Sequence, residues 1–219
     1  MNNIKHLLFS QFKTFALLCV SIIFSIVLLM IRIKLTHSFF YLFLVWNLFL
    51  AVIPFAITTY LVSLPKLSKF GLLIWFGVWL LFLPNAPYII TDLLHLKISN
   101  THLLWLDILV VSSFAFTGLM LLYLSLLDMK SILQERIKDK YVKPLIIVIL
   151  FLCGFGVYLG RFLRYNSWEI VQSPIFLFND IFDIIFHPNL HIEAWLFTLL
   201  FGSFLIVGYY GFKIITIEK

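Results

Sequence analysis

The stretch LPNAPYIITDLLHL, residues 83–96, decides the fold because it interrupts an apolar segment too short to cross a membrane alone. The apolar residues up to its first proline, Phe70–Leu83, would form a helix of roughly 21 Å, whereas the hydrocarbon core of a bilayer is about 30 Å thick. The helix can cross only by continuing through Pro84 and Pro87, which each remove a backbone donor. We therefore predict a broken third helix whose freed carbonyl groups face other helices or a wet cavity.

The composition of the chain places it in a membrane. Of its 219 residues, 63% are hydrophobic and 12% are charged, whereas soluble domains average about 25% charged residues. The net charge of +6 is therefore first a signal of topology, and the sequence has no polar domain that could bind nucleic acid. Cys19 and Cys153 lie in apolar segments and indicate neither a disulfide framework nor a redox motif.

Apolar segments long enough to span a bilayer recur along the chain. They predict an all-α bundle of six transmembrane helices that forms a single transmembrane domain over residues 1–219. The predicted spans are Phe15–Ile31, Phe39–Val62, Phe70–Ile90, Leu103–Leu127, Leu145–Leu163 and Ile192–Ile215. A shorter segment, residues 175–186, has its polar groups on one face and is predicted to be an interfacial helix on the outer leaflet. The mixed-charge segment Asp128–Lys143 predicts a solvated loop.

The distribution of lysine and arginine predicts the orientation of the bundle. One side carries Lys5, Lys13, Lys66, Lys69, Lys130, Arg136, Lys138, Lys140, Lys143, Lys213 and Lys219. The other side carries Arg32, Lys34, Lys97, Arg161 and Arg164. Because cytoplasmic loops hold the excess of basic residues, both termini are predicted to be cytoplasmic, in a cell (plasma or inner) membrane. The stretch at residues 83–96 then lies on the extracytoplasmic side.

The same stretch gathers polar side chains. On an α-helix Tyr88, Thr91, Asp92 and His95 would share one face, since their spacing is i, i+3, i+4 and i+7. A polar stripe at the end of a membrane-spanning helix needs a partner, so this face is predicted to line a polar site. Asn85, just before the face, is included in the predicted site.

A second polar segment, residues 160–169, begins at the outer end of the fifth predicted span. Arg161 and Arg164 lie one turn apart, and guanidinium groups bind phosphate or carboxylate bidentately. Asp107, about one turn inside the fourth span, is the natural counter-charge for Arg161, and Asp92 is another. The alternative interpretation is an arginine–aspartate pair that only holds helices together, or an arginine that reaches up to the headgroups.

Asp92 and His95 also offer the ingredients of catalysis or metal binding. A carboxylate and a histidine beside arginines can perform general acid–base chemistry, so these two are the candidate catalytic residues. With Asp107 or Glu169 the pair could hold a metal, although D-x-x-H spacing more often marks a hydrogen-bonded polar face. The chain contains no recognisable nucleophile or nucleotide-binding motif. The sequence therefore leaves enzymatic activity open and names no cofactor.

Two strings, LPNAPYIITDLLHL (83–96) and YLGRFLRYNSWE (158–169), resemble the hallmark segments of an uncharacterised family of bacterial multi-pass membrane proteins, domain of unknown function 1361. The resemblance covers most of the chain and implies a multi-pass protein of about this size. The family carries no established activity, so the resemblance adds weight to these two segments without naming a role.

Together these patterns predict an extracytoplasmic-facing polar site at the outer ends of the third, fourth and fifth spans. Its expected ligand is an anionic or polar headgroup, a lipid-linked envelope precursor or a small solute, and its expected partners are membrane lipids. The predicted ligand-binding residues are Asn85, Tyr88, Asp92, His95, Asp107, Arg161, Arg164, Asn166 and Glu169.

Three other functions were weighed against this one. The first is a membrane-embedded hydrolase or transferase that acts on an outer-leaflet lipid. The second is a structural or assembly subunit whose charges only lock helices together. The third, a transporter, is disfavoured because no ionisable residue lies deep in the inner half of any predicted span.

Overall fold

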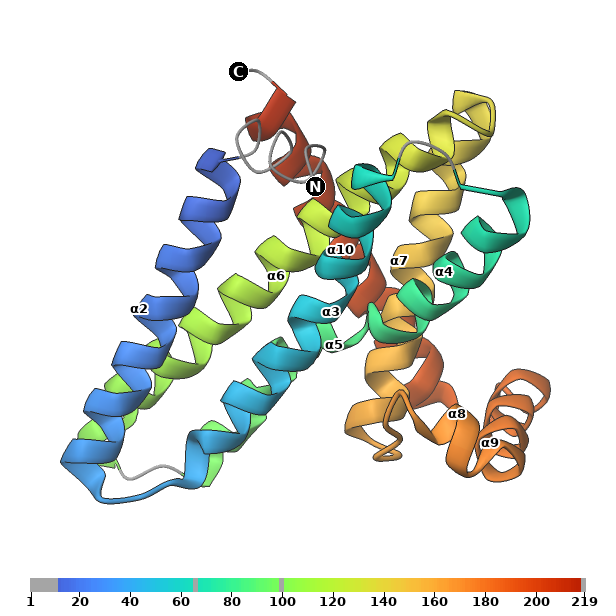
Figure 1. Cartoon of the computed structure of the whole chain (residues 1–219). Helices are drawn as coiled ribbons and strands as arrows, with labels where there is room; N and C mark the ends of the chain where they lie inside the picture. Colours follow the sequence, from blue (N-terminus) through green and yellow to red (C-terminus); the bar gives the residue numbers. More distant parts are fainter. Residues whose placement is uncertain (1–11, 65–66, 99–100, 218–219) are drawn as a thin grey trace. The chain divides into compact units, whose positions relative to one another are not determined.

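The computed structural model describes residues 12–64, 67–98 and 101–217, and these form helices and connections with no strand among them (Figure 1). The predicted all-α class is confirmed. Six helical segments in this part of the chain are long and apolar enough to cross a membrane: Phe12–Thr36, Phe40–Ser63, Lys69–Lys97, Leu104–Gln134, Asp139–Arg161 and Ile192–Thr216. They correspond one to one with the six predicted spans. Lys5, Lys66 and Lys219, which entered the predicted orientation, lie outside the described residues.

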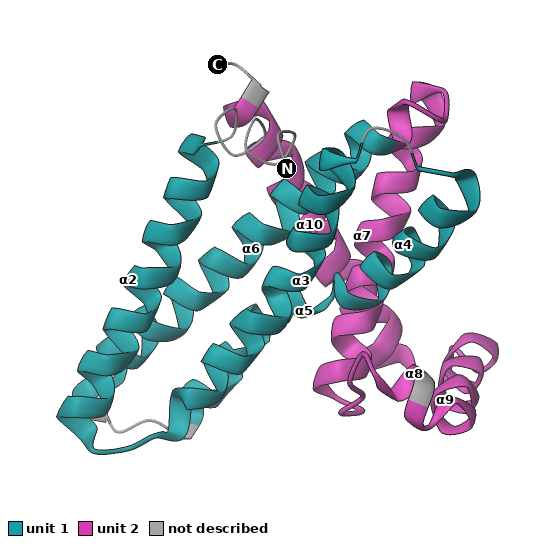
Figure 2. Ribbon diagram, in the orientation of Figure 1, with its two compact units in different colours: residues 1–132 teal, residues 133–219 magenta. Residues whose placement is uncertain are grey.

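The chain divides into two compact units, residues 1–132 and 133–219 (Figure 2). The described elements of the first unit are α2 (Phe12–Thr36), η1 (Phe40–Leu42), α3 (Phe43–Ser63), α4 (Lys69–Phe82), α5 (Asn85–Tyr88), η2 (Ile89–Ile98), η3 (Thr101–Leu103) and most of α6 (Leu104–Gln134). Those of the second unit are α7 (Asp139–Arg161), α8 (Glu169–Gln172), α9 (Pro174–Phe186) and α10 (Ile192–Ile217).

The first unit is organised around α6. In the most apolar part of this helix 61% of the residues are buried, against 17% for α2. The helices α2 and α3 run along it in Figure 1. Ser21 Oγ lies 2.6 Å from Thr117 Oγ1 and so links α2 to α6, while the rings of Phe15 and Phe55 link α2 to α3 at 5.9 Å between centroids. The centre of this unit is therefore α6, and α2 is its most exposed span.

The third span is broken where the two prolines predict a break. The helix α4 ends at Phe82, and Ala86 N, which would donate to Phe82 O in a continuous α-helix, donates instead to Leu83 O at 3.2 Å. The side-chain nitrogen Nδ2 of Asn85 takes the place of Ala86 N and donates to Phe82 O at 2.8 Å. The carbonyl groups of Phe82 and Leu83 are thus satisfied by protein groups, as a membrane environment requires.

The break packs closely on α6 at a glycine. A Cβ atom at Gly118 would overlap the carbonyl oxygen of Ala86 and would also crowd Ile89. Small residues let helix backbones approach one another in membranes, so Gly118 permits the contact between α5 and α6.

The fourth span is longer than predicted. The helix α6 continues to Gln134 rather than Leu127, and α7 begins at Asp139. Leu126, Met129 and Leu133 are buried along this extension, so an apolar stripe at helical spacing continues through the charged residues. The prediction of a solvated loop over Asp128–Lys143 was therefore wrong for most of that segment, and Asp128 is a helical residue.

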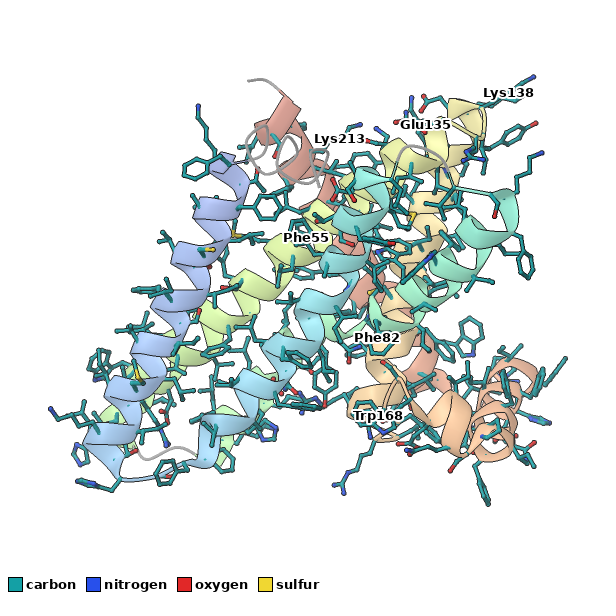
Figure 3. All side chains as sticks on the ribbon, viewed as in Figure 1. Phe55, Phe82, Glu135, Lys138, Trp168 and Lys213 are labelled. Atoms are coloured by element: carbon teal, nitrogen blue, oxygen red, sulfur yellow. The ribbon has the colours of Figure 1, made fainter. Side chains whose placement is uncertain are left out.

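The second unit is a helix pair with a short helix attached. The helices α7 and α10 approach closely at glycines, because a Cβ atom at Gly154 would lie 3.2 Å from Gly202 N. Figure 3 shows Trp168 near α8 at one end of this unit and Lys138 and Lys213 at the opposite end.

The predicted interfacial helix exists as α9, which is 13 residues long. Its Ile184 is 2% exposed and packs with Tyr158 and Ala194. Phe176 and Phe186 are each 71% exposed, so one face of α9 presents aromatic side chains to its surroundings. An exposed aromatic face of this kind is typical of helices that lie in a membrane interface.

Candidate functional site

A buried ion pair joins the end of α2 to the start of α6 in the first unit. Arg32 Nε donates to Asp107 Oδ1 at 2.9 Å, and the two side chains are 8% and 3% exposed. Arg32 Nη1 donates to Ser38 O at 2.9 Å. The guanidinium carbon also lies 4.7 Å from the centre of the Tyr41 ring, within the range of a cation–π interaction. The pair is formally neutral, so Asp107 is held in the interior without a net charge.

An arginine that the sequence did not suggest, Arg32, contacts Asp107. Sequence reasoning paired Asp107 with Arg161 and assigned Arg32 to topology alone. In the structure Arg32 is buried and supplies the hydrogen bond. The position of Arg32 directly at the end of an apolar span is the sequence signal for this pair, because a basic side chain there is costly without a counter-charge. Arg161 belongs to the second unit, and its pairing with Asp92 or Asp107 stays a prediction.

Asp92 forms a second polar contact network in the first unit. Its carboxylate is 1% exposed, and Oδ2 accepts a hydrogen bond from Asn47 Nδ2 at 2.8 Å. Oδ1 lies 3.9 Å from His95 Nε2, and the His95 side chain is 33% exposed. Asn47 was missed by sequence reasoning, although a single asparagine within the apolar span Phe43–Ser63 is a recognisable signal for a buried hydrogen bond.

His95 forms the accessible part of this network. Its imidazole meets the rings of Phe40 and Phe43 edge-on, with centroids 5.9 Å and 5.1 Å away. These aromatic contacts position the imidazole beside the carboxylate of Asp92. The buried carboxylate of Asp92 therefore lies beside the partly exposed imidazole of His95.

The polar face predicted on one α-helix is divided in the structure. Residues Ile89–Ile98 form a 3-10 helix, in which side chains three apart are aligned. Asp92 and His95 therefore form one column, while Tyr88 and Thr91 belong to another. Thr91 Oγ1 donates to Tyr88 O at 2.6 Å, so the buried Thr91 hydroxyl serves the backbone. The single stripe of four side chains was wrong because the helix after Pro87 is wound more tightly than an α-helix.

The two remaining predicted residues of the first unit flank the break. Asn85 and Tyr88 are half-buried. The amide nitrogen of Asn85 is used on Phe82 O, so Asn85 has a structural task at the break.

In the second unit the predicted residues lie in the turn after α7. Arg161 is the last residue of the helix, and Tyr165 N donates back to Leu159 O at 3.1 Å. Arg164 has a φ of 64°, a left-handed conformation that is uncommon for residues other than glycine. Its side chain is exposed. The turn thus presents the guanidinium of Arg164 to the surroundings.

Asn166 and Glu169 are hydrogen-bonded to each other in the turn before α8. Glu169 Oε1 accepts from both the backbone N and the side-chain Nδ2 of Asn166, each at 3.1 Å. This pattern satisfies the backbone N–H of Asn166 and commits one carboxylate oxygen of Glu169 to the turn before α8.

The polar residues of α9 lie on an exposed face and have specific partners. Asp183 contacts His187 Nδ1 at 2.8 Å and His191 Nε2 at 2.7 Å, through different carboxylate oxygens. The hydrogen bond with His191, together with that to His187, holds the pKa of Asp183 below its ordinary value. One turn earlier, a hydrogen bond from Tyr165 to Asp180 at 2.7 Å raises the pKa of the phenol to about 12. These contacts fasten α9 to the segments on either side.

The metal site considered in the sequence has two of its candidate ligands side by side in the structure. Asp92 and His95 lie together, but within the described ranges no group of three or more His, Cys, Asp or Glu residues is placed to hold a metal ion.

These features define a class: a multi-pass helical protein of the membrane-spanning type, with polar networks at the ends of its apolar helices. A family described as "Protein of unknown function (DUF1361)" matches residues 46–207, which is most of the chain and includes both hallmark segments. The chain belongs to this family. Comparisons with curated proteins and with solved structures found no match.

Proposed function

We propose that the protein binds a polar or anionic headgroup on the extracytoplasmic side of the cell membrane, with both termini cytoplasmic. A membrane lipid, a lipid-linked envelope precursor or a small solute with such a group would each supply the same chemistry. In this proposal His95 is the residue of the first unit that contacts the ligand, and Asp92 orients and polarises it.

One observation carries the proposal: a carboxylate that is 1% exposed is joined to an imidazole that is 33% exposed. Burial of a carboxylate in a membrane-spanning unit is costly and is typical of functional sites. Because His95 is partly exposed, its imidazole can contact a ligand while it lies beside the carboxylate of Asp92. Since the imidazole can donate or accept, it can contact a phosphate oxygen or a hydroxyl group.

The second unit supports the proposal through Arg164. Its exposed guanidinium follows the fifth span, and η2 is the end of the third, so the fourth and fifth spans separate them. An even number of crossings returns the chain to the same side of a membrane. An arginine is the side chain best suited to hold a phosphate or carboxylate.

The experiment is a lipid-retention measurement on the full chain. The protein is placed in nanodiscs of phosphatidylethanolamine and phosphatidylglycerol, and the lipids that stay bound after detergent extraction are counted by native mass spectrometry. We expect His95→Ala and Arg164→Ala each to reduce retention of phosphatidylglycerol about tenfold, the equivalent of one charge-assisted hydrogen bond. The control is His102→Ala, which changes an exposed histidine. Equal retention by the parent and both site variants would refute headgroup binding.

A second candidate function, catalysis on an outer-leaflet lipid, is favoured by the contact between Asp92 and His95. A buried carboxylate beside a half-exposed imidazole is an arrangement used for general acid–base catalysis. In that case Asp92→Asn abolishes turnover of the lipid while retention of the lipid persists.

The structural alternative is favoured by the pair between Arg32 and Asp107, which locks α2 to α6. If locking is the whole function, removing these charges lowers the melting temperature, and added lipid headgroup has no effect on it. The retention measurement and a melting curve with and without the lipid separate this alternative from the proposal.

A further inference from the structure

A third group of polar side chains lies inside the first unit, toward the C-terminal ends of α3 and α6. Thr58 and Ser125 are both 0% exposed. Trp79 Nε1 on α4 donates to Ser125 Oγ at 2.7 Å. Thr58 Oγ1 lies 3.4 Å from Ser125 Oγ and 3.4 Å from Asp128 Oδ2. The helices α3 and α6 therefore bring two hydroxyl groups and a carboxylate together, and α4 adds the indole N–H of Trp79.

A count of protons shows that Asp128 receives no proton from Thr58. The Thr58 hydroxyl has one proton, and its nearest acceptor is the backbone oxygen of Phe55 at 3.0 Å. Once that proton is used, Thr58 Oγ1 faces Asp128 with lone pairs. The Ser125 hydroxyl, which accepts from Trp79, keeps one proton of its own. Separations of 3.4 Å are also longer than the range of about 2.5–3.0 Å in which O–H···O hydrogen bonds form.

A count of charges shows that the group also lacks a cation. Asp128 is half-buried and its Oδ2 lies 3.4 Å from Thr58 Oγ1. Among the residues that the structure describes, no basic side chain pairs with it. A carboxylate in such a place is stable when it is neutralised or holds a cation.

The distances fit a coordinated ion. Oxygens that surround a cation at about 2.4 Å in octahedral directions lie about 3.4 Å apart, and calcium–oxygen distances fall in that range. Sodium has nearly the same radius as calcium, and a site with one carboxylate balances one positive charge rather than two.

We infer that Asp128 Oδ2, Thr58 Oγ1 and Ser125 Oγ form a sodium-binding site in the first unit. This site does not involve Asp92 or His95 and does not depend on headgroup binding. Asp128 is also an ionisable residue inside the fourth span. The lack of such a residue in the predicted spans was the argument against a transporter.

The test is thermal unfolding of the full chain in detergent, followed by tryptophan fluorescence. NaCl is titrated against choline chloride at constant ionic strength, and KCl is titrated in parallel. We expect the melting temperature of the parent to rise and saturate with sodium but not with potassium. Ser125→Ala and Thr58→Val should each raise the half-saturating sodium concentration about tenfold, and Asp128→Asn should abolish the response.

The matched control is Ser113→Ala, which removes another hydroxyl of α6. Ser113 Oγ donates to Val110 O at 2.8 Å, and Ser113 lies about three to four turns from Ser125 and Asp128. Its sodium response should equal that of the parent. The inference is overturned if the parent melts at one temperature in sodium, potassium and choline, or if Asp128→Asn keeps the response. Should Asp128→Asn fail to fold, Ser125→Ala decides, and an unchanged half-saturating concentration in that variant also overturns the inference.

Discussion

The pair between Arg32 and Asp107 offers a quantitative test of how the first unit is held together. We consider Arg32→Met, Asp107→Leu and the double variant. Each single change leaves one charge without its partner in an interior position, since the two side chains are 8% and 3% exposed. Breaking a buried pair from one side typically costs about 3–5 kcal/mol, whereas replacing both partners by apolar residues is often close to neutral.

The two single variants should not be equal. Arg32→Met also loses the hydrogen bond to Ser38 O and the contact over the Tyr41 ring, which adds about 0.5–2 kcal/mol. We therefore expect Arg32→Met to be the least stable variant and the double variant to be more stable than either single one. For a chain of this size, about 2–4 °C of melting temperature corresponds to 1 kcal/mol. Asp107→Leu should therefore lower the melting temperature by about 6–20 °C and Arg32→Met by about 7–28 °C.

The assay is thermal unfolding in nanodiscs, read by tryptophan fluorescence, combined into a double-mutant cycle. Asp107→Asn serves as the intermediate case because it keeps an oxygen that can accept from Arg32 Nε while removing the charge. If both single variants melt with the parent, or if the double variant loses the sum of the two single losses, then the pair is not a coupled buried lock and our reasoning is wrong.

Two further predictions concern packing and pH. Gly118→Ala should lower the free energy of unfolding by about 1–3 kcal/mol because its Cβ would overlap Ala86 O. The control is Gly77→Ala, which should not lower it, because a Cβ at Gly77 has nothing within 4 Å. Equal melting curves for the two variants would contradict the close packing of α5 on α6. The pKa of Asp183 is lowered in the folded state, so its contribution is present above the ordinary pKa of about 3.9 and is lost as pH falls below that value. Hydrogen exchange of α9 amides should accelerate over that window in the parent but not in Asp183→Asn, and an identical pH profile in both would exclude the role of Asp183.

The span count and the broken third helix could be predicted because they follow from length and from proline chemistry. Apolar segments of the required length correspond to the six spans of the structure. Pro84 and Pro87 remove backbone donors wherever they occur, so the break did not depend on tertiary packing.

The partners of the charged residues could not be predicted in the same way. Arg32 and Arg161 are both basic residues at the ends of apolar segments, and spacing alone does not say which one faces Asp107. Three-dimensional packing of α2 on α6 selects Arg32. Similarly, the sequence placed Asp128 in a loop because charges cluster there, although the buried stripe that includes Met129 continues the helix.

The most direct test of the proposed function is an experimental structure of the full chain in lipid nanodiscs, determined without added ligand. The proposal predicts a headgroup within hydrogen-bonding distance of the His95 imidazole, with Asp92 still bonded to Asn47. It is contradicted if His95 is surrounded only by side chains of the protein and by acyl chains.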